Sequence, residues 1–409
     1  MKVNNTEQVA KFSRVKIIGI VFFLYIVGTF GVSMLGWNEK LQQIPLYCFF
    51  AICLLFAKGN TLIKNFLLWY TPFALFCFIS SLYAPNMNVA TNMFASLGMA
   101  FLFGLSITIF LSYEGALSYI KCSYIVVALF VGIRLILSFE QENWWSRLGE
   151  SFNMNGNLVA LSFLIPFCFS VNDFLEKKQR IFSALAILVF SYVIMLTGSK
   201  KAIFAAVLFV FLFSIIKAGK ITKRMRAIII VGILAVILYN LVMKVEILYN
   251  VLGHRIKSMI RTFTSEDITS SNSSTGLRGG MIVFGLKEFL RSPVWGQGLN
   301  AFRVLYGDET EFYTYAHNNY VEVLVNTGII GFCMYYSLIG RTVRYFVKLK
   351  KQAKENAFLI ALTAVLLFYD IAMVSYYDTR IIMLSMIAFA GAHSAYHKKI
   401  EENDDKAIV

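Results

Sequence analysis

The sequence is poor in charged residues and in the residues that commonly bind metals. Only 15% of its 409 residues are charged, and it contains four histidines and six cysteines. The cysteines lie inside or beside apolar runs, none forms a CxxC pair, and none lies in the long polar segment before residue 317. This pattern argues against a disulfide framework and a cysteine-based zinc site. The sequence also shows no clear internal repeat.

Apolar residues are abundant instead, at 58% of the chain, and they form continuous runs. The runs are about 16 to 22 residues long, close to the roughly 20 residues that a helix needs to cross a bilayer. They predict an all-α, polytopic transmembrane helical bundle over residues 1–409, a single integral membrane domain with about twelve spans. The expected spans are 17–35, 42–57, 65–83, 93–112, 119–139, 157–172, 181–197, 202–217, 226–243, 318–339, 357–377 and 380–396. The first is expected to be a retained helix, because no small-residue cleavage site follows it.

In a membrane protein, the positions of the basic residues behind the net charge of +15 indicate which loops are cytoplasmic. Lysines and arginines cluster at the N-terminus, in alternate loops and in the tail 397–409, so these parts are expected to be cytoplasmic, including both termini. No nucleic-acid partner is expected. The remaining loops should face outward, namely 84–92, 140–157, the turn from 197, the large loop 244–317 and the turn from 376.

The outer turn TGSKK, from residue 197, contradicts the charge rule. Lys200 and Lys201 lie on the side where lysine is disfavoured. They either extend their side chains along the membrane interface or bind an anion there. The sequence leaves both readings open.

The large loop between the ninth and tenth spans does not resemble a disordered segment. After Ser274 and Thr275, an apolar stripe near helical spacing predicts a short amphipathic helix that ends at Pro293. This helix is expected to lie on the membrane or over the bundle. Arg278 falls in its first turn, where a cation is unfavourable without a nearby anion, although a solvated surface arginine is the alternative. Gly296 and Gly298 then predict a tight turn that allows close backbone approach.

The stretch HNNYVEVLVNTGIIGF, residues 317–332, places a histidine where the polar loop ends and a span begins. His317 could simply cap the helix or lie on the surface. Glu322 is about one helical turn away, where it could orient or charge the imidazole. Gly328 and Gly331 are positions at which neighbouring helices could pack closely.

Four stretches together resemble the O-antigen polymerase and O-antigen ligase superfamily, whose polymerases are called Wzy-like. RLGESFNMNGNLVA (147–160) is similar to the family's Arg-Gly-Asn block, and TGSKKAIFAA (197–206) to its Thr-Gly-Ser-Arg turn. GLRGGMIVFGLKEFLRSPVWGQGLNAF (276–302) resembles its Arg-Pro-Gly-x-Gly segment, and residues 317–332 resemble its His-Asn-Gly-Gly signature. The order, spacing and sidedness of these stretches carry the resemblance over about residues 145–335.

The resemblance implies glycosyl transfer at the outer face of the cytoplasmic membrane, without a cofactor, in O-antigen, capsule or exopolysaccharide synthesis. The donor would be an oligosaccharide linked to undecaprenyl pyrophosphate, and membrane lipid, a flippase and a chain-length regulator would be the partners. His317 and Arg278 take the catalytic positions. Lys200, Lys201, Arg147, Asn155, Asn318 and Glu322 are the expected substrate-binding residues. Lys200 stands where the family more often has arginine, so bidentate phosphate binding is not expected there.

The residues themselves support this chemistry. A cation aimed at the leaving diphosphate would neutralise its developing charge, and a histidine could take the proton of an acceptor hydroxyl. Acidic pairs such as Glu266 and Asp267 lack partner ligands, so metal-independent transfer is expected. Inside the spans, Arg134 and Asp370 could pair with each other or line a lipid-phosphate cavity.

Several functions remain open from the sequence alone. A polymerase is favoured, because no extra outer domain could dock a protein acceptor, but a ligase acting on lipid A core or another final acceptor uses the same chemistry. Transfer to protein is a third possibility. A transporter or flippase is disfavoured by the absence of repeat symmetry, the scarcity of charge within the spans and the gathering of polar features on one side.

Overall fold

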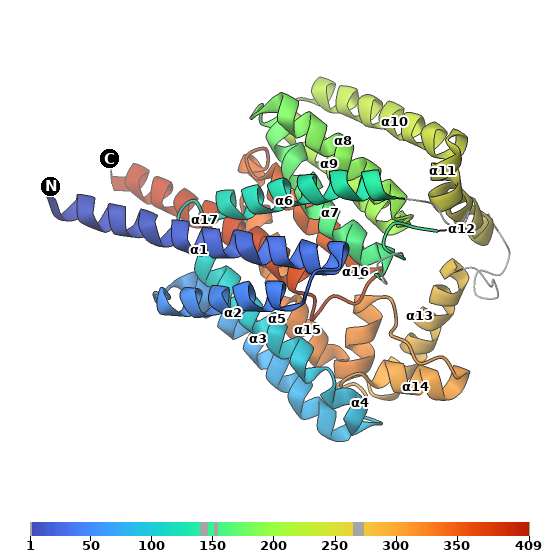
Figure 1. Ribbon diagram of the computed structural model, residues 1–409. Coiled ribbons are helices and arrows are strands. Elements are labelled where there is room, and N and C mark those ends of the chain that lie inside the picture. The colour runs from blue at the N-terminus through green and yellow to red at the C-terminus, as the bar shows by residue number, and fades with distance from the viewer. Residues whose placement is uncertain (1, 140–145, 151–153, 265–273, 409) are drawn as a thin grey trace. The chain divides into compact units, whose positions relative to one another are not determined.

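The computed structural model describes residues 2–139, 146–150, 154–264 and 274–408, and every regular element in these ranges is a helix (Figure 1). The expected all-α class is therefore confirmed for the described residues. The chain divides into two compact units, which are described one at a time. Unit 1 comprises Met1–Lys58 and Ile109–Lys257, and unit 2 comprises Gly59–Thr108 and Ser258–Val409. That the whole chain forms a single membrane domain stays a prediction.

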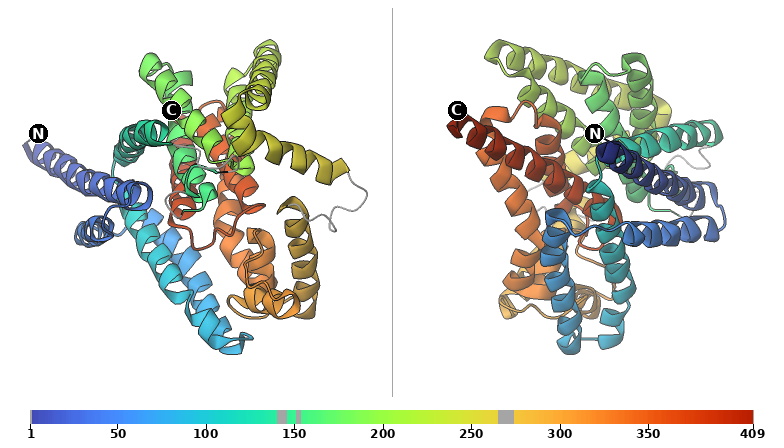
Figure 2. Two further views of the ribbon diagram at one scale, coloured as in Figure 1. Left: turned by 45° about the vertical axis from the view of Figure 1, so that its right-hand side comes forward. Right: turned by 90° about the vertical axis from the view of Figure 1, so that its left-hand side faces the viewer.

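Unit 1 is a bundle of packed helices. Its elements are α1 (Lys2–Leu35), α2 (Lys40–Leu55), α6 (Ala116–Ser138), α7 (Gly156–Leu175), α8 (Arg180–Leu196), α9 (Lys200–Ala218), α10 (Ile221–Lys244), α11 (Glu246–Leu248) and the π-helical turn η3 (Tyr249–Gly253). Helix α1 packs against α2 and α6, α7 packs against α6, α8 and α9, and α9 packs against α10 (Figure 2). The most buried of these helices is α7, which accordingly forms the centre of the unit.

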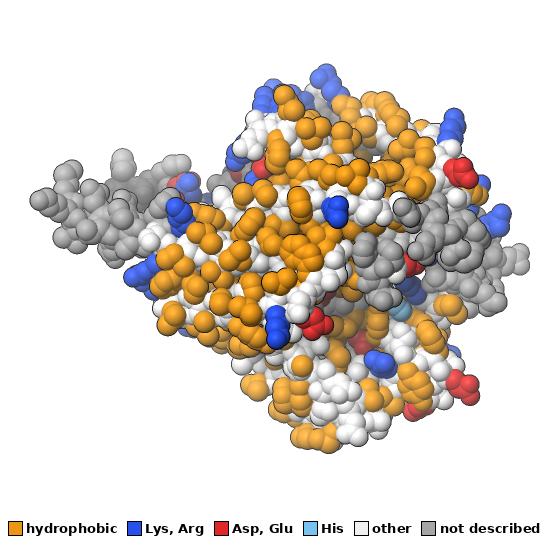
Figure 3. Space-filling view, in the orientation of Figure 1, with side chains coloured by type: hydrophobic (Ala, Val, Ile, Leu, Met, Phe, Trp, Pro, Cys, Tyr) orange, Lys and Arg blue, Asp and Glu red, His pale blue; other side chains and the backbone are white. Residues whose placement is uncertain are grey.

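The outer surface of unit 1 is apolar where a soluble protein would be polar. Hydrophobic side chains cover the visible face of α1, α2 and α6 (Figure 3). On these three helices, Ile20, Ile44 and Phe130 have 51%, 60% and 65% of their surface exposed. Such an extensive apolar surface is stable against lipid chains rather than water.

Unit 2 is organised around one long helix. Its elements are α3 (Thr61–Ser80), η1 (Ser81–Tyr83), α4 (Met87–Thr91), α5 (Phe94–Leu111), α12 (His254–Thr264), α13 (Ser274–Arg291), α14 (Ala301–Thr310), α15 (Asn319–Lys348), η4 (Lys350–Gln352), α16 (Ala357–Asp370) and α17 (Thr379–Ile408). Helices α5 and α12 extend across the boundary of the unit. Helix α15 packs against α3, α13, α14, α16 and α17. Buried hydrogen bonds anchor α3 in this unit, from Trp69 Nε1 to the Tyr335 carbonyl (2.7 Å) and from Tyr70 Oη to the Tyr376 carbonyl (2.9 Å).

Eight segments in the described residues are long and apolar enough to cross a membrane, which makes this a multi-pass membrane protein. They are Ser13–Leu35, Thr61–Tyr83, Met87–Leu111, Ala116–Ser138, Gly156–Leu175, Lys200–Ala218, Ile221–Lys244 and Asn319–Lys348. Helices α2, α8 and α16 are apolar but shorter, and α17 continues to Ile408, well past the expected end of the last span at 396. The count of twelve spans and the sidedness of the loops are not confirmed by these lengths.

Asparagine begins several of the helices. Asn60, Asn86, Asn155 and Asn318 each accept a hydrogen bond from a backbone N–H of the first turn of α3, α4, α7 and α15. This satisfies one of the N–H groups that a helix leaves unpaired at its start. A local sequence signal therefore fixes where these helices begin.

Candidate active site

The helix that carries the histidine motif is broken at Gly328. This glycine has φ 63° and ψ −166° inside α15, so the element consists of two helical segments joined at a kink. The turn before α14 docks its backbone against the break. Ile329 N–H donates to the Pro293 carbonyl (2.9 Å), and Gln297 N–H donates to the Val325 carbonyl (2.7 Å). The break thus frees backbone groups that hold the loop in place.

Both glycines at this crossing are required by the close approach. A Cβ on Gly328 would lie 2.3 Å from the Val294 carbonyl oxygen, and a Cβ on Gly296 would lie 2.4 Å from the Thr327 nitrogen. The expectation that the glycines near 297 permit close backbone approach is confirmed. The expected role of Gly328 in helix packing is corrected, because it forms the kink and receives the turn.

A small apolar core joins α13 and α14 to the first segment of α15. Its buried members are Met281, Phe284, Phe302, Ala316, Val321 and Val325. Gly285 lets α13 approach closely, because a Cβ there would lie 2.2 Å from Val321 Cγ1. The helix expected between Ser274 and Pro293 is therefore present and packs on α15. Leu277, one of the apolar residues of this helix, is 52% exposed.

His317 lies two residues before α15, next to the N-cap residue Asn318, and has a left-handed backbone conformation (φ 53°). Its imidazole is half-buried and packs on Tyr315, with ring centroids 4.1 Å apart and planes at 47°. Capping is performed by the next residue, since the Asn318 side chain accepts from Val321 N–H (3.0 Å) and donates to the Ile371 carbonyl (3.1 Å). The capping alternative for His317 is thus wrong, and its ring is presented by a strained backbone.

Glu322 holds the backbone next to His317. The carboxylate is 1% exposed and accepts from Ala316 N–H (2.7 Å) and from Asn326 Nδ2 (3.2 Å). Asn326 in turn accepts from Phe302 N–H (3.1 Å) at the start of α14. The structure therefore links Glu322 to the polypeptide that precedes the histidine. Its expected role of orienting His317 stays a prediction, and the Ala316 backbone is the link through which it would act.

Two arginines from the loop helices, Arg278 and Arg303, act electrostatically on tyrosine side chains. Arg278, half-buried on α13, is close enough to Tyr315 to influence its titration: burial raises the pKa of Tyr315, and the positive charge of Arg278 opposes that rise. Arg303, on the first turn of α14, has a similar relation to Tyr377, whose pKa is raised by burial and lowered in part by Arg303. Sequence reasoning singled out Arg278 but missed Arg303, Tyr315 and Tyr377. The spacing of residues along a helix does not show which side chains of different loop segments lie close together in the fold.

A closed circuit of hydrogen bonds fixes the segment after α16 to the start of α15. Asn319 Nδ2 donates to Tyr336 Oη (2.9 Å), which donates to Asp370 Oδ2 (2.9 Å). Asp370 Oδ1 accepts from Ser375 Oγ, and Ser375 N–H returns to Asn319 Oδ1 (2.8 Å). Asn319 and Asp370 are 0% and 1% exposed.

The circuit changes the account of Asp370. The pairing between Asp370 and Arg134 that the sequence left open stays a prediction, whereas the structure gives Asp370 two hydroxyl partners within unit 2. Asp370 therefore needs no cation to satisfy its oxygens. Asn319, Tyr336 and Ser375 were not predicted as site residues, because their partners lie far apart in the sequence.

Next along the chain, Asp378 and Arg380 form an ion pair of 2.6 Å at the start of α17. Burial alone would raise the pKa of Asp378, but the charge of Arg380 and hydrogen bonds from Arg380 and Ile381 lower it below its usual value. The pair thus anchors the far end of the segment that the circuit holds.

The other expected binding residues belong to unit 1. Arg147 Nε donates to Glu150 Oε1 (2.7 Å), and its side chain lies against the glycines at 156 and 198, because a Cβ on Gly198 would lie 3.0 Å from Arg147 Cδ. Asn155 is the exposed N-cap of α7, accepting from Asn157 N–H (2.9 Å).

Lys200 and Lys201 are the first two residues of α9, and both are half-buried. Ser199 Oγ, just before them, donates to Asn157 Oδ1 (2.8 Å), which ties this turn to the start of α7. Within unit 1 the structure therefore brings the TGSKK turn, the start of α7 and Arg147 together. Their expected role in substrate binding stays a prediction.

Within the described part of the chain, no group of three or more His, Cys, Asp or Glu residues could hold a metal ion. The acidic pair Glu266 and Asp267 lies outside the described residues, as do 140–145 and 151–153 of the expected outer loop 140–157. Whether the reaction needs a metal is therefore left to experiment.

No curated protein matches the chain. A family model does match part of it: residues 185–336 fit the model described as O-antigen ligase. This range contains Lys200, Lys201, Arg278, His317, Asn318 and Glu322, whereas Arg147 and Asn155 precede it. Residues 185–336 are therefore similar to the O-antigen ligase family, which is consistent with the O-antigen polymerase and ligase superfamily.

Proposed function

We propose that the protein is a polysaccharide polymerase that transfers a growing glycan from undecaprenyl pyrophosphate onto the next lipid-linked repeat unit. The observation that supports it best is the setting of His317. His317 lies in the range that the O-antigen ligase model matches. Its left-handed backbone holds the imidazole against Tyr315, and the positive charge of Arg278 acts on that tyrosine.

The reaction replaces one bond at the anomeric carbon by another. The acceptor hydroxyl oxygen bonds to this carbon while the bond to the diphosphate oxygen breaks, and the diphosphate leaves with the electron pair. His317 takes the hydroxyl proton as the new bond forms, a contribution of roughly 100-fold to 10,000-fold for a positioned base. Histidine is the side chain that most readily takes up and releases a proton near neutral pH. The proton is later released to water.

Arg278 neutralises the charge that develops on the leaving diphosphate. Lys200, Lys201 and Arg147 serve as binding residues for the pyrophosphate, and Asn155, Asn318 and Glu322 support or line the substrate sites. Glu322 acts through the backbone before His317, since its oxygens accept from Ala316 and Asn326. Transfer needs no metal. Full activity in excess chelator is expected, and activity that returns only with divalent ions would contradict this.

The reaction takes place at the outer face of the cytoplasmic membrane, with both termini in the cytoplasm. The supporting observation is the clustering of lysine and arginine at the termini and in alternate loops. The flippase and the chain-length regulator would be functional partners in the same pathway.

Purified protein supplied with lipid-linked repeat units from its native host tests the proposal. Wild type should produce a ladder of glycans on a gel, and His317→Ala and Arg278→Ala should abolish it while remaining folded. Lys287→Ala is a matched control, because Lys287 is exposed on the same helix as Arg278. Unchanged ladders from both site variants would contradict the assignment.

A ligase is the second candidate, and the description of the matched model favours it. It would move finished glycan onto lipid A core or another final acceptor. In the same assay a ligase makes no ladder from repeat units but attaches preformed glycan to an added acceptor. Vectorial uptake into sealed vesicles with no change in glycan length would instead indicate a transporter.

A further inference from the structure

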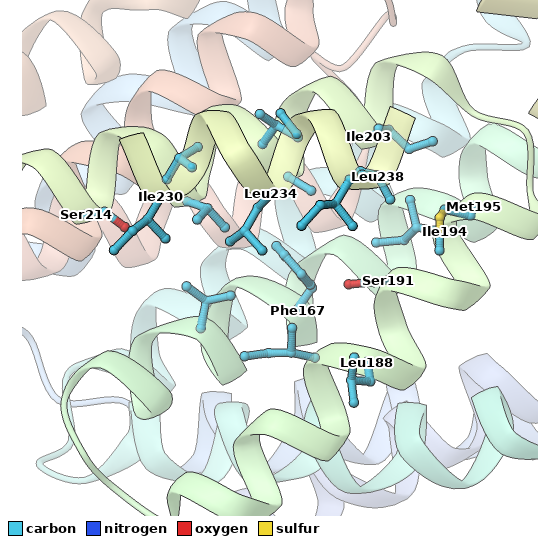
Figure 4. Close-up of a pocket in the computed structure, with 18 of the residues that line it drawn as sticks. Phe167, Leu188, Ser191, Ile194, Met195, Ile203, Ser214, Ile230, Leu234 and Leu238 are labelled. Atoms are coloured by element: carbon cyan, nitrogen blue, oxygen red, sulfur yellow. The ribbon is translucent and has the colours of Figure 1, made fainter. Parts of the chain in front are cut away.

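Unit 1 contains an apolar cavity of about 510 Å³ between α7, α8, α9 and α10 (Figure 4). Each helix contributes one stripe of side chains, for example Ile203, Val207 and Val210 from α9. Among the lining residues in the described chain, the polar side chains are those of Ser191 and Ser214. The volume falls within the range of about 300 to 1,000 Å³ that is usual for ligand sites.

The cavity is long and lies along the membrane-spanning direction of α9. Its lining runs from Ile203 to Ser214, which corresponds to roughly 16 Å at 1.5 Å per helical residue. Figure 4 shows Ile194, Met195 and Ile203 at one end, and Ser214 and Ile230 at the other. An apolar space of this kind does not retain water, so a hydrocarbon chain is the occupant that fits its chemistry.

The end at Ile203 lies next to a cationic turn. Lys200 and Lys201 begin α9 within three residues of Ile203, and Met195, another lining residue, lies two residues before the turn begins at Thr197. The N-terminus of α9 adds a partial positive charge at the same place. A ligand that fits both parts therefore combines a multiply charged anionic head with a long apolar chain.

We propose that this cavity holds the polyprenyl chain of a polyprenyl diphosphate, with the diphosphate at the start of α9. The inference rests on the proposed function, because it assigns a place to the lipid part of the substrate. It adds that the chain, and not only the diphosphate, contributes to affinity. The side chains of α10 that line the cavity, such as Leu234 and Ile237, are 54% and 57% exposed, so the chain can enter from the lipid side of α10.

Binding to the full-length protein in phosphatidylcholine nanodiscs tests this inference without any acceptor. Displacement of labelled undecaprenyl diphosphate is measured with unlabelled undecaprenyl diphosphate, inorganic pyrophosphate and phosphatidylglycerol as competitors. Leu234→Trp fills the cavity, and Ile233→Trp, on the neighbouring residue that does not line it, is the matched control. Val210→Phe fills the cavity from α9.

Undecaprenyl diphosphate should bind at least about tenfold more weakly to both filling variants, because apolar chain burial is lost, while pyrophosphate affinity stays unchanged. The control should behave like wild type. Wild-type affinity in both filling variants would overturn the proposal, and so would equal displacement by phosphatidylglycerol, which would mean that any lipid occupies the cavity. If the binding results hold but no glycan is transferred, the proposed function fails and the cavity assignment stands.

Discussion

The carboxylate of Glu322 accepts a hydrogen bond of 2.7 Å from the backbone N–H of Ala316, six residues earlier and directly before His317. The bond is buried, and it connects the first turn of α15 to the polypeptide that presents the imidazole. A glutamate that the sequence placed near the histidine thus acts on its backbone. A substitution at 322 that keeps an acceptor for the Ala316 N–H should therefore have a different effect from one that removes it.

Glu322→Gln should lose less stability and activity than Glu322→Ala, because the amide oxygen can still accept from Ala316 N–H while the amide NH2 faces the Asn326 Nδ2 donor. Glu322→Ala should destabilise the protein by about 1 to 3 kcal/mol, the usual cost of leaving a buried donor unsatisfied. Thermal unfolding in detergent and glycan formation would be measured for both. If Glu322→Gln is as damaging as Glu322→Ala, the negative charge is needed and the backbone role is insufficient.

Gly328→Ala should prevent the turn at 293–298 from docking. The added Cβ would lie 2.3 Å from the Val294 carbonyl oxygen, and alanine is strained at φ 63°. Gly340→Ala on the same helix is the control, because nothing lies within 4 Å of its added Cβ. It should be neutral or stabilising by up to about 1 kcal/mol. Unfolding temperatures and protease sensitivity of the loop would be compared, and equal behaviour of the two variants would show that the kink is dispensable.

Asn319→Ala should open the hydrogen-bond circuit. It removes the acceptor of two buried N–H groups, those of Ser375 and Tyr376, so a loss of about 1 to 3 kcal/mol or more is expected. Ser337→Ala is the control, since Ser337 is exposed and donates only within its own helix. Hydrogen exchange of the 371–378 amides should rise in Asn319→Ala alone. Unchanged exchange would mean that Asn319 does not hold this segment.

The ion pair of Asp378 and Arg380 predicts an acid-dependent loss of stability. Because the folded state lowers the pKa of Asp378, this carboxylate stabilises the fold above its unfolded pKa of about 3.9, and the contribution disappears as the pH falls through the lower, folded value. Asp378→Asn should therefore be less stable than wild type at pH 7, with a difference that shrinks below about pH 4. Unfolding measured across this range would test the assignment. A constant difference at all pH values would attribute the effect to packing.

The sequence by itself determined the features that depend on local composition. The apolar runs predicted an all-helical membrane protein, and the stripe between Ser274 and Pro293 predicted α13, because burial in lipid or on one helix face leaves a pattern in neighbouring residues. The histidine signature lies within the range matched to the O-antigen ligase model.

The tertiary structure decided the features that depend on contacts between distant residues. Only the fold shows that Gly328 breaks α15 to receive the 293–298 turn, and that Asn319 binds the backbone of Ser375, 56 positions away. It also shows that four separate helices enclose one apolar cavity beside the start of α9. Hydrogen bonds and cavity walls join residues that are adjacent in space but unrelated in sequence order, so no periodicity records them.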